Sequence, residues 1–375
     1  MKKRINISQV DTIFANGSYS IEFLIYYKNR LKTGNIRSAL KKLSSPFWPV
    51  FGEYRSGTIH FETYSEKEHL DETISKENFD PADSPREVYN NYHQIIPSDI
   101  KKLFFLKIIQ YNNGTVLIPK LKHLGGDGYS YFYFLSTLAA VSRAATIPFR
   151  KSIISRLYKP HHNRTILKEF NFEAVDLQPI KKVKRLTMEI EEVSKENIYK
   201  KIKETAVAFD QKVSTNDILS AMVVKNLAAA QKDRFGENFQ LTIPIDVRRQ
   251  IKEYGTRFFG NGIMFKDIKF KTNEIEKLSI EEIAIKIRKS MPDVTKEIFI
   301  KFLEHLEVII AEKQFEKLRP FDPDRGCLVT NLSKLPAHRL NFGTGNPDSI
   351  FTLTIEKNSA GVMSDKENFI LRTVY

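Results

Sequence analysis

The sequence has a single cysteine, Cys327, among its 375 residues. One thiol excludes a disulfide within the chain and any metal site built from several thiolates. Long apolar runs are also missing, since none approaches the roughly 20 residues that a helix needs to cross a bilayer. The basic residues 1–4 are followed by a mixed segment rather than by the apolar core of a secretory signal. These absences predict a soluble, cytoplasmic protein with no membrane span.

Several motifs are absent as well. The sequence contains no P-loop, no G-x-G-x-x-G after a predicted strand, no internal repeat and no low-complexity tract. Nucleotide hydrolysis, dinucleotide redox chemistry and solenoid folds therefore have no support. What the chain has is the balance of a folded globular protein, with 41% hydrophobic and 28% charged residues. Its length exceeds one ordinary core and predicts two domains or two fused subdomains.

Positive charge predominates in the chain. Lys and Arg number 59 against 45 Asp and Glu, which gives a net charge of +14. Such an excess attracts anionic partners, namely nucleic acid, an anionic membrane surface or a phosphate-bearing small molecule. The basic runs are scattered along the chain, whereas a nucleic-acid site would need them gathered on one face with stacking aromatics. A nucleic-acid partner is therefore not favoured.

Strand-like and helix-like segments are mixed across both halves of the chain, which predicts α/β layers throughout. Two β-rich runs flank Asn112-Asn113-Gly114, a turn that predicts a hairpin because Asn-Gly tolerates positive φ angles. The predicted strands are 20–27, 103–110, 115–121, 239–247, 258–266 and 350–355. The predicted helices are 35–43, 129–145, 195–208, 216–234, 280–289 and 296–313.

A basic segment interrupted by prolines lies between the two halves. Pro148, Pro160 and Pro179, with the basic runs 161–164 and 181–185, predict an irregular connector. The paired histidines at 161–162 have no acidic or cysteine partner at ligand spacing, so we expect them in a solvated surface. The predicted division is an N-terminal subdomain at residues 1–155, a connector at 156–200 and a C-terminal subdomain at 201–375.

A glycine-rich corner, His123-Leu-Gly-Gly-Asp127-Gly128, follows the hairpin. Its glycines let the backbone turn sharply and leave room for a ligand. A histidine suits general-base work because its neutral imidazole is abundant at cellular pH. The alternative is a turn or core histidine, with Asp127 capping the following helix. The motif alone does not separate the two interpretations.

The corner resembles the H-x-x-x-D-G motif of the BAHD acyltransferases and of the wider chloramphenicol-acetyltransferase-like superfamily, which includes peptide-synthetase condensation domains. Further segments resemble other motifs of that family, in the same order along the chain. They are 214–221, a helix start; 241–249, which carries a structural arginine; 257–261, similar to Y-F-G-N; 330–336, similar to T-S-W-x-x-L-P; and 341–347, similar to D-F-G-W-G-x-P.

The resemblance implies two chloramphenicol-acetyltransferase-like α/β subdomains with a central channel, and His123 near the middle of that channel. His123 would deprotonate an acceptor hydroxyl or amine, which attacks the thioester carbonyl of an acyl donor. Asp127 would pair with Arg248 and, with Gly128, support the loop that carries His123. Thr330 matches the position that donates a hydrogen bond to the oxyanion, although an ordinary strand threonine is an equal alternative.

Three positions depart from the family pattern. Asn341 replaces an aspartate, so any ion pair made there becomes a neutral hydrogen bond. Leu332 and Thr344 replace tryptophans, which changes the shape that the family pattern implies near the channel. Asn261, Asn341, Gly343 and Gly345 are expected to be structural, the two glycines because they permit tight turns.

The implied function is transfer of an acyl group from a thioester, most simply acyl-CoA, to a small-molecule acceptor. Neither a metal nor a permanently bound cofactor is implied, and the net positive charge suits the phosphates of CoA or an acidic acyl carrier protein. Two alternatives stay open. One is a condensation-like enzyme that depends on a carrier protein, and the other is an inactive binding module of the same fold.

Overall fold

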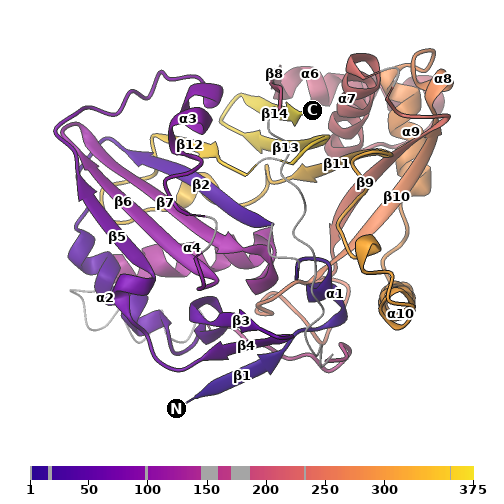
Figure 1. Ribbon diagram of the computed structural model, residues 1–375. Helices are drawn as coiled ribbons and strands as arrows, with labels where there is room; N and C mark the ends of the chain where they lie inside the picture. The colour runs from indigo at the N-terminus through magenta and orange to yellow at the C-terminus, as the bar shows by residue number, and fades with distance from the viewer. Residues whose placement is uncertain are drawn as a thin grey trace.

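The computed structural model describes residues 2–15, 19–97, 100–144, 159–169, 186–231, 234–354 and 356–375. Within these residues the strands form three sheets, and helices cover the two larger ones (Figure 1). The smallest sheet has the order β1-β4-β3 and consists of β1 (Lys3–Asn6), β4 (Thr58–Phe61) and β3 (Glu53–Arg55). The short helix α1 (Gln9–Thr12) follows β1.

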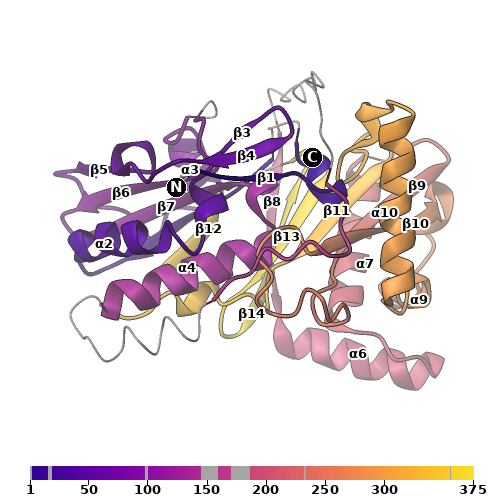
Figure 2. The same cartoon turned by 90° about the horizontal axis from the view of Figure 1, so that it is seen from below.

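The first large sheet has five strands in the order β12-β2-β7-β6-β5. Helices α2 and α4 cover one face and α3 covers the other (Figures 1 and 2). Side chains of β2 alternate between the two cores, because successive residues of a strand point to opposite faces. The elements are β2 (Ser20–Tyr27), β5 (Leu70–Ile74), β6 (Phe104–Tyr111), β7 (Gly114–Lys122), β12 (Ser349–Thr352), α2 (Thr33–Leu43), α3 (Pro85–Tyr92) and α4 (Gly128–Arg143).

The second large sheet has six strands in the order β10-β9-β11-β13-β14-β8. Helices α7 and α9 pack on one of its faces and share a core with it. The strands are β8 (Met188–Ser194), β9 (Asn238–Asp246), β10 (Ile263–Lys271), β11 (Gly326–Asn331), β13 (Ser359–Ser364) and β14 (Asn368–Val374). The helices are α6 (Lys195–Phe209), α7 (Thr215–Ala230), α8 (Thr272–Ile275), α9 (Ile280–Ser290) and α10 (Lys296–Ala311).

Segments from the second half of the chain take part in the structure of the first half. Strand β12 pairs antiparallel with β2, with Ile350 opposite Ile25. Phe299 and Leu303 of α10 belong to the same hydrophobic core as Phe14, which follows α1. The chain therefore returns to its first sheet after building most of the second. The subdomain boundaries given above stay a prediction.

Most predicted elements are present, and the strand over 20–27 has the predicted bounds. The predicted hairpin is β6 and β7, and Gly114 at its turn has φ +158°, where a Cβ would lie 2.1 Å from the carbonyl oxygen of Tyr27. The prediction of a strand over 258–266 is wrong at its start, because β10 begins at Ile263 and 258–262 form a loop. Ala145 and Ile355, the predicted ends of a helix and a strand, lie outside the described residues.

In the part of the chain that the structure describes, no helix is both long enough and apolar enough to cross a membrane.

Candidate active site

His123 lies where β7 ends and a single turn of 3-10 helix, His123–Gly125, leads into α4. Its backbone N–H donates to the carbonyl oxygen of Tyr19 (3.0 Å), and its carbonyl oxygen accepts from the N–H of Gly126 (3.1 Å). Gly126 has φ +156°, and a Cβ there would lie 2.8 Å from the Cβ of Ser130. The sharp corner therefore requires glycine at 126, and it fixes the backbone that carries the imidazole.

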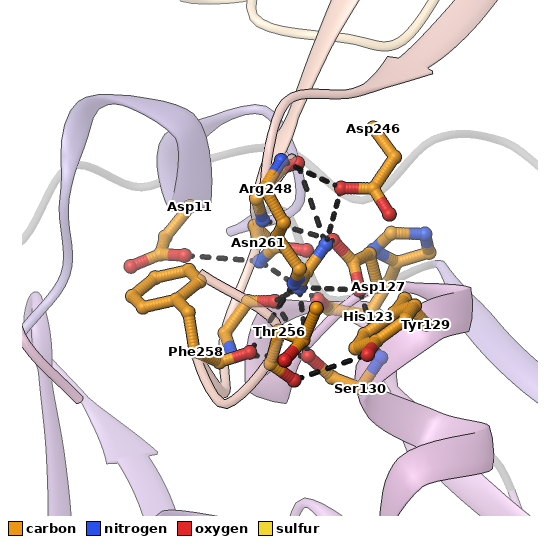
Figure 3. Close-up of polar contacts among 12 residues, drawn as sticks. Asp11, His123, Asp127, Tyr129, Ser130, Asp246, Arg248, Thr256, Phe258 and Asn261 are labelled. Carbon is orange, nitrogen blue, oxygen red and sulfur yellow. Dashed lines mark hydrogen bonds and ion pairs between the residues drawn. The ribbon is translucent and has the colours of Figure 1, made fainter. Parts of the chain in front are cut away.

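Asp127 caps α4 and forms an ion pair at the same time, so the two roles considered for it coexist. Its Oδ1 accepts from the N–H of Ser130 (2.9 Å) and from Nη2 of Arg248 (2.9 Å). Its Oδ2 lies 2.8 Å from Nη1 of Arg248 and accepts from the N–H of Gly262 at 2.8 Å. The carboxylate is thus fully engaged by groups other than the imidazole, as Figure 3 shows.

Arg248 ties the corner to the loop that precedes β10, and only 2% of its surface is exposed. Its Nε donates to the carbonyl oxygen of Phe258 (3.2 Å) and its Nη2 to that of Gly260 (2.9 Å). A Cβ on Gly262 would lie 2.8 Å from the guanidinium carbon, so the loop can close over Arg248 only with glycine there. Burial alone would lower the pKa of Arg248, but Asp127 and Asp246 raise it above its ordinary value.

Ser130, in the first turn of α4, completes this network and was not among the predicted site residues. Its hydroxyl donates to the carbonyl oxygen of Gly260 (2.8 Å) and accepts from the N–H of Gly260 (3.1 Å) and from Nη2 of Arg248 (3.0 Å). Ser130 is fully buried, and each of these groups would be costly to leave unpaired. The first turn of α4 and the 258–262 loop therefore form one rigid unit.

Asn261 connects this unit to the N-terminal helix α1. Its Nδ2 donates to the carbonyl oxygen of His123 (3.1 Å) and to Oδ1 of Asp11 (2.9 Å). Asp11 is buried, accepts from Ser8 in a capping box, and pairs with Nη2 of Arg164 at 3.0 Å. Asp11 and Arg164 are residues that the sequence interpretation missed. The capping box at Ser8 is a local signal for a helix start, but it gives no hint of contact with residue 123.

Phe14 stacks on the imidazole of His123, with ring centroids 3.8 Å apart and an interplanar angle of 17°. Phe14 is 2% exposed and its ring covers one face of the histidine. No carboxylate among the described residues bonds to the imidazole, and its buried Nδ1 makes no well-formed hydrogen bond. The plane of the ring is thus held by stacking and by the backbone of the corner rather than by an acidic partner.

Burial lowers the pKa of His123, and the nearby Asp127 opposes this shift. The carbonyl oxygen of His123 itself, Asn261 and Asp11 oppose it more weakly. Because the net direction is downward, the neutral imidazole prevails at cellular pH. A neutral imidazole has a lone pair that can accept a proton, which is the chemistry of a general base.

Thr330 lies on β11, opposite Gly361 of β13, and is half-buried. Its hydroxyl makes no hydrogen bond to any described residue. Leu332, two residues further on, reaches the start of α4, because a Cβ on Gly128 would lie 3.5 Å from its Cδ2. The structure thus brings the end of β11 to the helix that begins beside His123.

The model of one protein family, the Transferase family, matches residues 2–369. The chain belongs to the Transferase family, which comprises the BAHD acyltransferases. The resemblance seen in the sequence is confirmed. Among curated proteins no sequence match is found.

Solved structures show the same fold. TRI101 of F. graminearum, complexed with ethyl coenzyme A, matches with a TM-score of 0.73 at 14% identity, over 100% of this chain and 95% of that one. Vinorine synthase matches with a TM-score of 0.74 at 15% identity, over 100% and 94%. The first condensation domain of the CDA synthetase has a TM-score of 0.62 at 11% identity, over 99% and 90%. The predicted chloramphenicol-acetyltransferase-like α/β fold is confirmed.

The segment of this Transferase-family chain around Asn341 lies away from His123. Oδ1 of Asn341 accepts from the N–H groups of Gly343 (2.7 Å) and Gly345 (3.3 Å), whose φ angles are +120° and +108°. Arg143 donates to the backbone carbonyl oxygen of Asn341 rather than to its side chain. Arg143 ends α4, about 22 Å along the helix axis from its start at Gly128, so Asn341 lies by the end of α4 remote from His123. Asn341 closes a turn here through neutral hydrogen bonds.

The histidines of the connector are not solvated, which corrects the expectation from the sequence. His161 and His162 are half-buried, and their rings bond to the carbonyl oxygens of Tyr254 (2.7 Å) and Phe259 (3.2 Å). Burial lowers the pKa of His162 to about 4. His161 and His162 thus pack against the loop that holds Arg248, whereas residues 188–200 of the predicted connector form β8 and the start of α6. Residues 145–158 and 170–185 lie outside the described residues. No cluster suited to a metal ion occurs among the residues described.

Proposed function

We propose that the protein transfers an acyl group from acyl-CoA to the hydroxyl or amine of a small molecule, with His123 as general base. The observation that carries this proposal is a neutral, half-buried imidazole at a corner held by Asp127, Arg248 and Asn261. The family and the CoA complexes of similar structures support acyl-CoA as the donor. An acceptor of either kind fits this chemistry, and a cytoplasmic location stays a prediction.

In the proposed reaction the acceptor proton passes to Nε2 of His123 as the acceptor oxygen or nitrogen bonds to the thioester carbon. The tetrahedral intermediate carries a negative oxygen, for which the hydroxyl of Thr330 is the proposed hydrogen-bond donor. Collapse of the intermediate breaks the carbon–sulfur bond, and the imidazolium returns its proton to the thiolate of CoA. Asp127 and Arg248 act as positioning residues and exchange no proton.

The test replaces His123 by alanine and measures CoA release with acetyl-CoA over a panel of alcohols and amines. A general base contributes on the order of 100- to 10,000-fold, so we expect His123→Ala to lose transfer by at least that lower factor. His305→Ala, on the exposed face of α10, is the matched control and should keep full activity. Undiminished turnover by a folded His123→Ala would refute the mechanism.

The alternative donor is tested in the same assay. An acyl group presented on an acyl carrier protein should be a poorer substrate than the same group on CoA. A preference for the carrier would instead favour the condensation-like alternative, and inactivity with both donors would favour the binding module.

A further inference from the structure

Arg372 lies in register with Thr330 across three neighbouring strands. Thr330 of β11 is opposite Gly361 of β13, and Gly361 is opposite Arg372 of β14. Residues in register point to the same face of a sheet, and Val362 and Leu371 belong to the core on the other face, with α7 and α9. Thr330 and Arg372 therefore project from the face that α7 and α9 do not cover, with Cα atoms about 10 Å apart.

The guanidinium of Arg372 is buried without a negative partner. Arg372 is 9% exposed, and no carboxylate among the described residues forms an ion pair with it. Nη1 donates to the carbonyl oxygen of Thr352 (2.7 Å), Nη2 donates to that of Thr354, and the buried Nε has no partner. Burial lowers the pKa of Arg372 to about 10, and among its neighbours Tyr89 opposes this shift. A buried cation with an unpaired N–H is costly unless an anion meets it.

Nη2 of this guanidinium lies over Gly361. A Cβ on Gly361 would have one close neighbour, Nη2 of Arg372, at 3.8 Å, which is ordinary van der Waals contact. The position between Thr330 and Arg372 is therefore the one at which the sheet carries no side chain. Nε and Nη2 form one edge of the guanidinium, the edge that binds a carboxylate through two parallel hydrogen bonds.

A second set of contacts places Arg372 near His123. The hydroxyl of Thr354, whose carbonyl oxygen binds Arg372, donates to the carbonyl oxygen of Ser20 at 2.9 Å. The preceding residue, Tyr19, accepts the backbone N–H of His123. The nearby carboxylate of Glu22 is engaged by the buried Lys120 at 3.3 Å, so it already has a cationic partner.

We propose that Arg372 binds a carboxylate group of the substrate beside Thr330. This inference rests on the proposed function and adds a substrate class to it, since one of the two reactants carries an acidic group. The carboxylate can belong to the acceptor, as in a hydroxy acid, or to the acyl group, as in a dicarboxylic monothioester. Both sources present the same planar anion to the Nε and Nη2 edge.

The experiment measures kcat/KM for matched pairs that differ in one carboxylate. The acceptor pair is 3-hydroxybenzoate and its methyl ester with acetyl-CoA, and the donor pair is succinyl-CoA and butyryl-CoA with a neutral alcohol. In the wild type we expect the acidic member of one pair to be preferred. In Arg372→Met this preference should fall by on the order of 10- to 100-fold, the worth of a charge-assisted hydrogen bond. The pair that responds identifies the source of the carboxylate.

Two further variants separate recognition from structure. Gly361→Ala keeps Arg372 and its backbone partners but occupies the space over the sheet, so it should lower the same preference without unfolding. Lys289→Met removes one positive charge from the exposed end of α9 and should leave the preference unchanged.

Failure of this inference differs from failure of the proposed function. Turnover that needs His123 but shows no preference within either pair, or a preference unchanged in Arg372→Met and Gly361→Ala, would overturn the role of Arg372 alone. If no pair is turned over, calorimetry with 3-hydroxybenzoate and with succinyl-CoA decides, because Arg372→Met should weaken binding of one of them. Equal binding of both by the variant and the wild type would also overturn the inference.

Discussion

Two buried arginines lie near His123 and have opposite surroundings. Arg248 is 2% exposed, and its donors meet Asp127, Asp246, Ser130 and backbone carbonyl oxygens. Arg372 is 9% exposed, and in the described structure it meets two carbonyl oxygens and no carboxylate. The first arginine belongs to a closed network that holds the corner, whereas the second has a buried Nε without a hydrogen-bond partner. Burial alone therefore does not separate a structural arginine from one that can bind a ligand; the partners do.

The largest effect is expected from breaking the closed network. Arg248→Met leaves Asp127 buried without its cation, and breaking a buried ion pair in this way costs about 3–5 kcal/mol of the free energy of unfolding. Urea denaturation measures this loss, and acyl transfer should fall with it because the corner loses its support. Arg372→Met should cost clearly less stability, since it leaves no carboxylate unpaired. Equal destabilisation by the two variants would contradict the comparison.

An intermediate effect is expected at Thr330. Thr330→Val keeps the shape of the side chain and removes the hydroxyl, so the melting temperature should change little. If Thr330 donates to the oxyanion, kcat should fall by roughly 100- to 1,000-fold, the usual cost of one such donor. Thr330→Ser restores the hydroxyl and should recover most of the rate. A wild-type kcat in Thr330→Val would show that Thr330 is an ordinary strand residue and not a hydrogen-bond donor to the oxyanion.

The smallest effect is expected at Phe14 and is read as a pH profile. Burial lowers the pKa of His123, so kcat/KM of the wild type should stay near its maximum below the ordinary histidine value of about 6.5. Phe14→Leu uncovers one face of the imidazole, raises the pKa of His123 towards that value and moves the acidic limb to higher pH. The rate at pH 6 should then fall relative to the rate at pH 8.

Phe51→Leu is the matched control for this profile. Phe51 is also fully buried, but its ring contacts are with Tyr64, His69, Phe104 and Phe134 and not with His123. It should cost stability without moving the acidic limb. A shift of the same size in both variants would show that loss of core packing, rather than the stacked ring, sets the pKa of His123.

Local sequence signals, such as glycines at turns and short apolar runs, predict the structure near the site well. The hairpin turn at Gly114 and the corner at Gly126 follow from glycine chemistry, and the strand over 20–27 follows from its apolar run. The wrong start of the strand predicted over 258–266 has a physical reason. Gly260 and Gly262 bring the backbone against Arg248, and such close approach needs a loop rather than a strand.

Contacts between distant segments were beyond a single sequence. Asp11 and Phe14 lie more than 100 residues before His123, and nothing in their own segment indicates that they touch it. Arg372 looks like one basic residue in an ordinary strand. Its place beside Thr330 depends on the order of β11, β13 and β14 in the sheet, which no local pattern encodes.

The return of β12 to the first sheet has a consequence for dissecting the protein. Expressing residues 1–200 alone would remove β12 and leave the backbone N–H and C=O groups of β2 bare along one side. Such an unprotected edge pairs readily with other chains, so this fragment is expected to aggregate rather than to report the properties of half an enzyme. Supplying residues 340–356 in trans as a peptide that can rebuild the missing strand would be the rational way to rescue it.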